Sequence, residues 1–370
     1  MRINERRSLW RRMKPYLTVF DAPLALIVFL ILCAGLMTIH SAGIDFPGRV
    51  EGQMRNAVVA FVFMWVAANV SPQTLMRLAV PVYVLGVVLL VAVALFGIVK
   101  NGSRRWIYVG INVQPSEILK IAVPLMLAWY FHTRASVKHW SSFLIAAVLL
   151  IIPFTFIAKQ PDLGTATLVL SSGMYVIFLA GLSWKMLAGM AATGIASLPI
   201  VWSMLHDYQR ERVMTLIDPT ADPLGKGFHI IQSTIAIGSG GVLGKGWMNG
   251  TQARLEFLPE ATTDFVFAVY SEEFGLVGNI VLLFLYLLLI GRGMMIAANA
   301  PNTFTRLLAG AITMIFFTYA FVNMAMVAGI LPVVGVPLPF MSYGGTALLT
   351  LGVGAGILMS IQRHRKLVQT

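Results

Sequence analysis

Residues 280–290 read Ile-Val-Leu-Leu-Phe-Leu-Tyr-Leu-Leu-Leu-Ile, and residues 87–96 read Val-Val-Leu-Leu-Val-Ala-Val-Ala-Leu-Phe. Both stretches are apolar at nearly every position, whereas the strands of an outer-membrane barrel alternate apolar and polar residues. In lipid, an unbroken apolar stretch satisfies its backbone polar groups within itself only as a helix. These two stretches therefore predict membrane-spanning α-helices.

The composition of the whole chain extends this prediction. Of its 370 residues 58% are hydrophobic and 11% are charged, against about 25% charged in an ordinary soluble domain. A single soluble core, a disordered chain and a fibrous chain are thereby excluded. Cys33 is the one cysteine, so the chain forms no intramolecular disulfide.

The chain contains about ten apolar runs of the 18 to 25 residues that a helix needs to cross the hydrocarbon. We therefore predict an all-α polytopic integral membrane protein that forms one membrane domain over residues 1–370. The predicted spans are 22–41, 54–71, 76–99, 115–132, 142–158, 163–182, 184–205, 264–291, 304–329 and 340–361.

The positions of the charged residues predict the orientation. With the N-terminus in the cytoplasm, 15 of the 27 basic residues but only Glu5 and Asp21 among the acids fall on that side. This is the positive-inside pattern. An even number of spans also places the C-terminus inside, so residues 1–21 and 362–370 are predicted basic cytoplasmic ends. The basic residues behind the net charge of +12 are then expected to contact anionic lipid headgroups and not nucleic acid.

Two segments depart from the pattern of spans and short connections. Residues 206–263, between the seventh and eighth spans, form a long extracytoplasmic loop that is rich in glycine and in charges of both signs. Loops of that length are usually functional or disordered, and this content favours ordered function. Residues 331–346 contain Pro332, Pro337 and Pro339 among several glycines, which predicts a re-entrant or broken element.

Ionisable residues at membrane depth are costly and are therefore candidates for function. Glu117 and Lys120 lie three residues apart on one face of the fourth span. Lys159 and Asp162 lie at the connection between the fifth and sixth spans, and Asp264 begins the eighth. The predicted topology puts all five on the outer side, from which we infer that they converge in one outward-facing cavity.

Each of these residues also has a structural interpretation that the sequence leaves open. Glu117 and Lys120 fit an ion pair at a helix end, and Lys159 fits a side chain that extends to the membrane surface. Asp162 and the pair Thr263-Asp264 fit helix N-caps.

Two further groups of polar residues have weaker support. Arg105 and Arg210 offer guanidinium groups on the outer side, suited to phosphate or simply solvated. Glu272 and Glu273 point about 100° apart on a helix, so we expect one of them to make a structural contact and neither to be catalytic.

The chain resembles the SEDS family (RodA, FtsW and SpoVE) along nearly its whole length. Residues 323–347 match the signature that includes Gly329-Ile330-Leu331-Pro332, Gly335 and Ser342-Tyr343-Gly344-Gly345-Thr346-Ala347. Resemblance continues through Gln114-Pro115-Ser116-Glu117, Gln160-Pro161-Asp162-Leu163-Gly164-Thr165, residues 227–246 and Glu256-Phe257-Leu258-Pro259-Glu260 up to Asp264. The short N-terminus and Asp207-Tyr208-Gln209-Arg210 favour the RodA branch.

The resemblance implies a peptidoglycan glycosyltransferase of the bacterial inner membrane, with its active site facing the periplasm. Such an enzyme polymerises lipid II, an undecaprenyl-pyrophosphoryl disaccharide-pentapeptide, into glycan strands for cell elongation and rod shape. It implies a class B penicillin-binding protein as the crosslinking partner, with MreC, MreD and RodZ as other members of the elongation complex.

The resemblance also implies roles for individual residues. Asp264 maps onto the family's essential aspartate and is assigned as general base for the acceptor 4-hydroxyl. Lys120, Lys159 and Arg210 are candidates to stabilise the diphosphate, with Glu117 and Asp162 orienting them or contacting sugar hydroxyls. The other candidate substrate-binding residues are Arg105, Gln232 and Ser239. A divalent cation, Mg²⁺ or Mn²⁺, could help to stabilise the negative charge on the leaving group, but the sequence does not identify residues that would bind it.

Two other classes of function fit the same spans. A lipid II flippase would also need a polar cavity and broken helices. A scaffold of the elongation complex explains the spans but not the buried charges.

Overall fold

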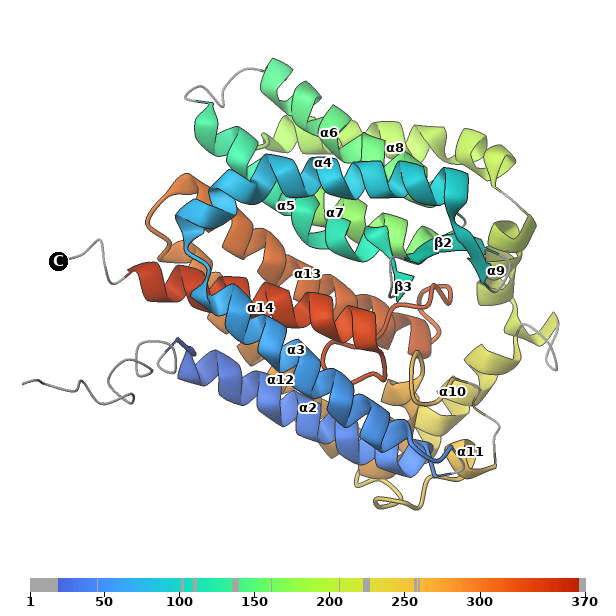
Figure 1. Cartoon of the computed structure of the whole chain (residues 1–370). Coiled ribbons are helices and arrows are strands. Elements are labelled where there is room, and N and C mark those ends of the chain that lie inside the picture. The colour runs from blue at the N-terminus through green and yellow to red at the C-terminus, as the bar shows by residue number, and fades with distance from the viewer. Residues whose placement is uncertain are drawn as a thin grey trace, which may run out of the picture.

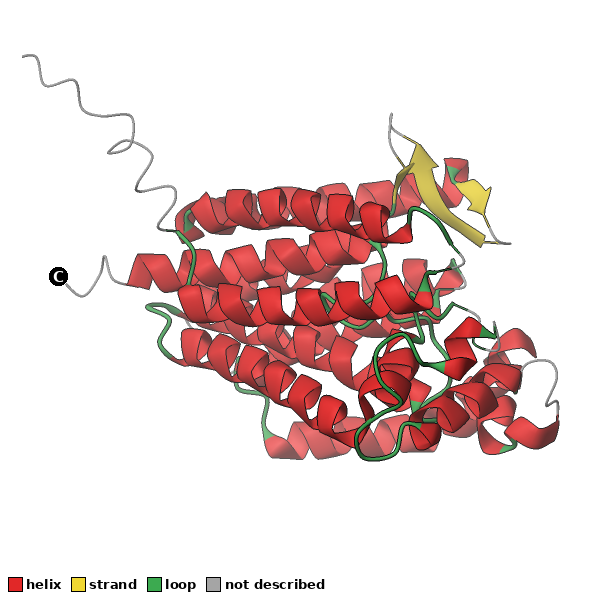
Figure 2. Ribbon diagram, turned by 90° about the horizontal axis from the view of Figure 1, so that it is seen from below, coloured by secondary structure: helices red, strands yellow, loops and turns green. Residues whose placement is uncertain are grey.

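The computed structural model describes residues 19–44, 46–100, 103–108, 112–134, 140–160, 162–205, 207–221, 227–255, 258 and 260–365. Over these residues the chain is a bundle of long helices, with a few short elements gathered at one end (Figures 1 and 2). The long helices are α2 (Ala22–Ala42), α3 (Arg49–Asn69), α4 (Pro72–Phe96), α5 (Pro115–Thr133), α6 (Trp140–Lys159), α7 (Leu163–Leu179), α8 (Trp184–Met204), α12 (Val266–Ala298), α13 (Thr303–Val327) and α14 (Gly345–Arg365).

Each of the ten predicted spans overlaps one of these long helices. Six of them are long and apolar enough to cross a membrane, namely α2, α4, α6, α12, α13 and α14. The all-helical fold class is therefore confirmed, while the number of spans and their orientation stay predictions. Three predicted boundaries were wrong by five residues or more, because α3 begins at Arg49, α12 continues to Ala298 and α14 begins only at Gly345.

Local signals explain where several helices begin. Asp21 accepts a hydrogen bond from the Leu24 amide at 3.1 Å and caps α2, and Ser71 caps α4 in the same way. Asn302 and Thr305 form a reciprocal capping box at the start of α13. Each cap satisfies an amide that has no partner inside its own helix.

The core of the bundle surrounds α13. This helix packs against α5, α7 and α12, while α14 lies along α3. Almost three quarters of the 18 most apolar residues of α13 are buried inside the protein, whereas 39% or less is buried in α2, α4, α6 and α12. The side chains of Phe304, Phe316 and Tyr319 are fully buried along it, so α13 is a fixed platform for the elements around it.

The short elements share one end of the bundle, opposite the C-terminal end of α14 (Figure 1). They include a three-stranded antiparallel sheet, β1 (Ile98–Lys100), β2 (Ser103–Tyr108) and β3 (Asn112–Val113). The sequence did not predict this sheet. The predicted long loop 206–263 contains helices α9 (Asp207–Ile217), α10 (Phe228–Ser239) and α11 (Thr251–Arg254) and the turn η1 (Pro219–Ala221).

Helix α12 is interrupted at Gly275, where φ is +64°. The amides of Leu276 and Val277 donate to the carbonyls of Gly241 and Val242, at 2.9 and 3.1 Å. In return, the carbonyls of Glu272 and Glu273 accept from the amides of Lys245 and Gly246, both at 3.0 Å. The backbone of residues 240–246 thus takes the place of the missing helical turn.

Candidate active site

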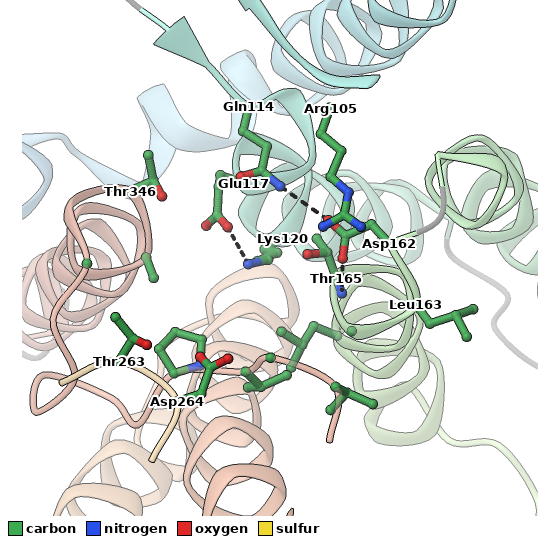
Figure 3. Close-up of a pocket in the computed structure, with 18 of the residues that line it drawn as sticks. Arg105, Gln114, Glu117, Lys120, Asp162, Leu163, Thr165, Thr263, Asp264 and Thr346 are labelled. Atoms are coloured by element: carbon green, nitrogen blue, oxygen red, sulfur yellow. Dashed lines mark hydrogen bonds and ion pairs between the residues drawn. The ribbon is translucent and has the colours of Figure 1, made fainter. Parts of the chain in front are cut away.

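A cavity of about 430 Å³ opens between α5, α7, the turn that precedes α12, and the segment that leads into the first turn of α14. Figure 3 shows Arg105, Gln114, Glu117, Lys120 and Asp162 on one side and Thr263 and Asp264 across from them. Polar atoms make up most of the accessible surface of its wall. The remaining lining residues are Leu163, Gly164, Thr165, Leu168, Val333, Val334, Gly335, Val336, Pro337, Tyr343, Gly344, Thr346 and Ala347.

Lys120 supplies a buried positive charge to the cavity. Its Nζ donates to Glu117 Oε1 at 2.7 Å and to the Tyr319 hydroxyl at 2.6 Å, and the residue is only 3% exposed. Glu117 Oε2 accepts from the Thr350 hydroxyl at 3.1 Å. An ammonium has three donor hydrogens, so two hold Lys120 in place and one remains for a group in the cavity.

Asp162 combines the two roles that the sequence left open. Its Oδ1 accepts from the Thr165 amide at 3.1 Å and caps α7. Its Oδ2 accepts from Gln114 Nε2 at 3.3 Å and lies 3.6 Å from Arg105 Nη1. The side chain of Arg105 is one third exposed, so this cation is held at the edge of the cavity while its charge stays accessible.

Asp264 lies in the turn that leads into α12. The amide of Phe265 donates to the carbonyl of Glu260 at 3.3 Å. The N-cap position of α12 is Phe265, and it has no side-chain cap. The interpretation of Thr263 or Asp264 as an N-cap was therefore wrong, because the turn places both residues before the cap position and in the cavity wall.

The segment between α13 and α14 is broken, as its prolines predicted, with positive φ angles at Gly335 and Phe340. Its backbone groups bond to side chains of other elements, as a non-helical backbone among spans requires. Gln53 Nε2 donates to the Ser342 carbonyl at 3.0 Å, and the Tyr286 hydroxyl donates to the Pro339 carbonyl at 2.7 Å. These contacts fix the segment as a wall of the cavity.

Comparisons with known proteins identify the family to which the chain belongs. A family model for FtsW, RodA and SpoVE, described as "Cell cycle protein", matches residues 22–367. The chain belongs to this family. It is 50% identical over 350 residues to the peptidoglycan glycosyltransferase MrdB of Escherichia coli strain K12, which covers 94% of this chain and 95% of that one. It is also 35% identical over 362 residues to a probable peptidoglycan glycosyltransferase FtsW of Geobacter sulfurreducens, with 94% and 96% covered.

Solved structures of the FtsW, RodA and SpoVE family share the fold. The rod shape determining protein RodA of Thermus thermophilus matches with a TM-score of 0.71 and 26% identity, over 94% of this chain and 97% of that one. A chain from a study of how a peptidoglycan synthase complex coordinates polymerization and crosslinking matches with a TM-score of 0.81 and 33% identity, over 94% and 98%. The chain is accordingly a multi-pass membrane protein.

Five of the nine residues predicted from the sequence line the cavity, namely Arg105, Glu117, Lys120, Asp162 and Asp264. The other four lie elsewhere. Lys159 is exposed on the last turn of α6, and Arg210 donates from α9 to the carbonyls of Trp202 and Ser203 at the end of α8. Gln232 and Ser239 lie on α10, outside the cavity lining. The roles of these four residues stay predictions.

The cavity also contains polar residues that the reasoning did not single out, namely Gln114, Thr165 and Thr346. All three lie inside the family motifs, and these motifs were the sequence signal that could have identified them.

Glu272 and Glu273 both make structural contacts, although such a contact was expected for only one of them. Glu272 Oε1 accepts from Lys245 Nζ at 2.6 Å, and Glu273 accepts from the Ser41 hydroxyl.

His229 on α10 lies beside the turn that carries Asp264. Its ring stacks on Phe265 with centroids 5.9 Å apart. Burial lowers the pKa of His229 below its ordinary value of 6.5, although the charge of Glu260 opposes this shift. The imidazole is therefore neutral at pH 7.

Among the residues that the structure describes, no group of three or more His, Cys, Asp or Glu side chains is arranged to hold a metal ion.

Proposed function

We propose that this chain is a peptidoglycan glycosyltransferase that polymerises lipid II, with the Asp264 cavity as its active site. The observation that carries the proposal is the placement of a carboxylate, Asp264, across one cavity from a buried ammonium, Lys120, and a partly exposed guanidinium, Arg105. Inverting glycosyl transfer needs a base at the attacking hydroxyl and positive charge at the leaving group.

In the proposed reaction, the GlcNAc 4-hydroxyl of one lipid II attacks the anomeric carbon of the growing chain. The hydroxyl proton passes to the Asp264 carboxylate while the new C–O bond forms. The bond between the anomeric carbon and the diphosphate breaks, and undecaprenyl diphosphate leaves with the bonding electron pair. The third donor of Lys120 and the Arg105 guanidinium stabilise the charge that develops on this diphosphate, while Glu117 and Asp162 hold the two cations.

The cavity is proposed to face the periplasm of a bacterial inner membrane. The cavity residues Gln114 and Arg105 belong to the same end of the bundle as the sheet (Figure 1). At the opposite end, Arg292 pairs with Asp21 at 2.5 Å, where the basic residues predict the cytoplasm. Lipid II carries its disaccharide on the outer leaflet when it is polymerised, so the proposed orientation matches the proposed substrate.

A class B penicillin-binding protein is the proposed partner, because the structure matched at a TM-score of 0.81 comes from a complex that coordinates polymerization with crosslinking. MreC, MreD and RodZ are proposed as further members of the same elongation complex.

The test is polymerisation of purified lipid II by the chain copurified with its class B partner in liposomes. Wild type is compared with Asp264→Asn, and Asp218→Asn is the matched control because its carboxylate is fully exposed and bonds only locally, to residues 220 and 221. Long glycan from wild type and the control, with a loss of at least about 1000-fold for Asp264→Asn, supports a general base. The same assay with and without Mg²⁺ or Mn²⁺ tests the need for a divalent cation.

The absence of glycan from an intact wild-type complex, supplied with divalent cations, would overturn the polymerase. A lipid-translocation assay on the same liposomes then distinguishes a flippase, which moves lipid II without forming product, from a scaffold, which does neither.

A further inference from the structure

Asn323 is a buried amide on the last turns of α13, behind the cavity wall. Its side chain is fully buried, and its Nδ2 donates two hydrogen bonds to backbone carbonyls of different segments. One acceptor is the carbonyl of Asp264 at 2.9 Å, and the other is the carbonyl of Val336 at 2.8 Å. Both acceptors belong to residues that line the cavity, whereas Asn323 itself does not.

The two acceptors are carbonyl oxygens, so only the NH₂ group of an amide can satisfy both. This fixes the orientation of the side chain and uses both of its donor hydrogens. Among the described residues, Asn323 Oδ1 is buried and has no partner. A buried acceptor without a partner is costly, so Asn323 is a poor choice for stability alone, and its two-donor nitrogen is what the position requires.

The two hydrogen bonds hold the backbone at the point where the Asp264 carboxylate faces the segment that contains Gly335 and Val336. A methyl group added to Gly335 would come within 3.4 Å of Asp264 Oδ2, so this carboxylate lies against the backbone next to Val336. Both segments are non-helical, and the Tyr343 amide joins them directly by donating to the Thr262 carbonyl at 2.8 Å. Asn323 ties each of them to α13, the most buried of the candidate spans.

We propose that Asn323 is the positioning residue for Asp264, because one amide nitrogen holds the turn that carries the carboxylate and the wall that the carboxylate faces. The proposal rests on the proposed function of Asp264 as the base. Asn323 does not touch substrate; it sets the separation of the two segments between which the acceptor hydroxyl is deprotonated.

The first test replaces the amide with groups that cannot donate. Asn323→Asp keeps the shape but exchanges the NH₂ for oxygen, and Asn323→Leu removes the donors without adding a charge. The matched control is Ser233→Ala, which deletes a buried hydroxyl that donates to the Val327 carbonyl at 2.9 Å, at the same end of α13 but outside the cavity. All variants are measured as complexes with the partner, per folded protein.

A misplacement of about 1 Å costs on the order of 100-fold in rate, so we expect kcat to fall about 100-fold in either Asn323 variant. KM for lipid II should stay within about 3-fold, because the charged groups that hold the diphosphate are untouched. Ser233→Ala should lower the melting temperature while keeping kcat. An Asn323 variant that melts early but retains kcat would overturn the proposal and leave a purely structural hydrogen bond.

A second measurement does not depend on glycan synthesis. Asp264→Cys in a Cys33→Ala background places a single thiol in the cavity, and its rate of labelling by a water-soluble thiol reagent reports how residue 264 is presented. With Asn323→Leu added, labelling should become faster because the turn loses its tie to α13. Equal labelling rates in both backgrounds would overturn the proposal, whereas a wild type that makes no glycan would overturn the proposed function and leave this comparison intact.

Discussion

The ion pair between Lys120 and Glu117 gives the sharpest test of whether the charges in the cavity exist for chemistry or for stability. The side chains are 4% and 13% exposed, and the Nζ–Oε1 distance is 2.7 Å. Removing one partner of such a pair leaves an uncompensated charge, which costs about 3–5 kcal/mol. We expect a loss of that size in the free energy of unfolding for Lys120→Met.

The double variant Lys120→Met with Glu117→Gln should recover most of that loss, to within about 1 kcal/mol of wild type, because no unpaired charge remains. The amide introduced at position 117 can still accept from the Thr350 hydroxyl, which now bonds Glu117 Oε2 at 3.1 Å. Polymerisation should nevertheless stay at least about 100-fold below wild type, since no ammonium is left to stabilise the departing diphosphate.

The assay has two arms on the same purified samples, unfolding by SDS titration in mixed micelles and polymerisation of lipid II with the partner bound. A stable double variant that still polymerises lipid II would refute the reasoning and leave the pair as a structural contact at a helix end. A double variant as unstable as the single one would show that Lys120 stabilises the fold through Tyr319 more than through Glu117.

Three further predictions concern residues outside the cavity. Lys159→Ala should change the polymerisation rate by less than about 2-fold, since surface substitutions away from a site are usually tolerated; a large loss would place Lys159 in substrate binding. Glu272→Gln should lower the free energy of unfolding by about 3 kcal/mol, because Lys245 loses its buried partner, with Glu211→Gln as the surface control in the same SDS titration. Stability should fall as the pH drops below about 6.5, because burial lowers the pKa of His229 and only the unfolded chain takes up the proton there. His229→Phe, which keeps an aromatic ring on Phe265, should reduce that pH dependence in melting curves between pH 5 and 8; an unchanged slope would assign it to other groups.

The helices that sequence reasoning placed well are those whose limits are set locally. Asp21 and Asn302 cap their helices through side chains three residues away, so a short window contains the signal. Two of the limits that failed involve distant partners. The predicted eighth span stopped before Arg292, but α12 continues because that guanidinium is neutralised by Asp21. The start of α3 was placed too late, because Arg49 stacks on Tyr343 at 4.9 Å.

The part of the candidate site that could be predicted consists of ionisable residues that the predicted spans place at membrane depth. Glu117, Lys120 and Asp162 are ionisable residues at membrane depth, and that cost is visible in a sequence. Lys159 and Arg210 are also cations but lie outside the cavity lining, because their positions depend on how α6 and α9 pack. The hydrogen bonds of Asn323 join residues 59 and 13 positions away, so no local pattern could reveal them.

The exchange of backbone hydrogen bonds at Gly275 has a practical consequence for protein engineering. Surface loops usually tolerate inserted residues at little cost, which makes them the usual sites for affinity tags and fluorescent labels. Residues 240–246 break that rule, because one added residue would shift their carbonyls and amides out of step with those of α12, and methyl groups on Gly240 or Gly244 would collide with the carbonyls of Ser271 or Glu273. The turn Pro219–Ala221, in which no residue is buried, is where a tag at this end of the bundle should be inserted.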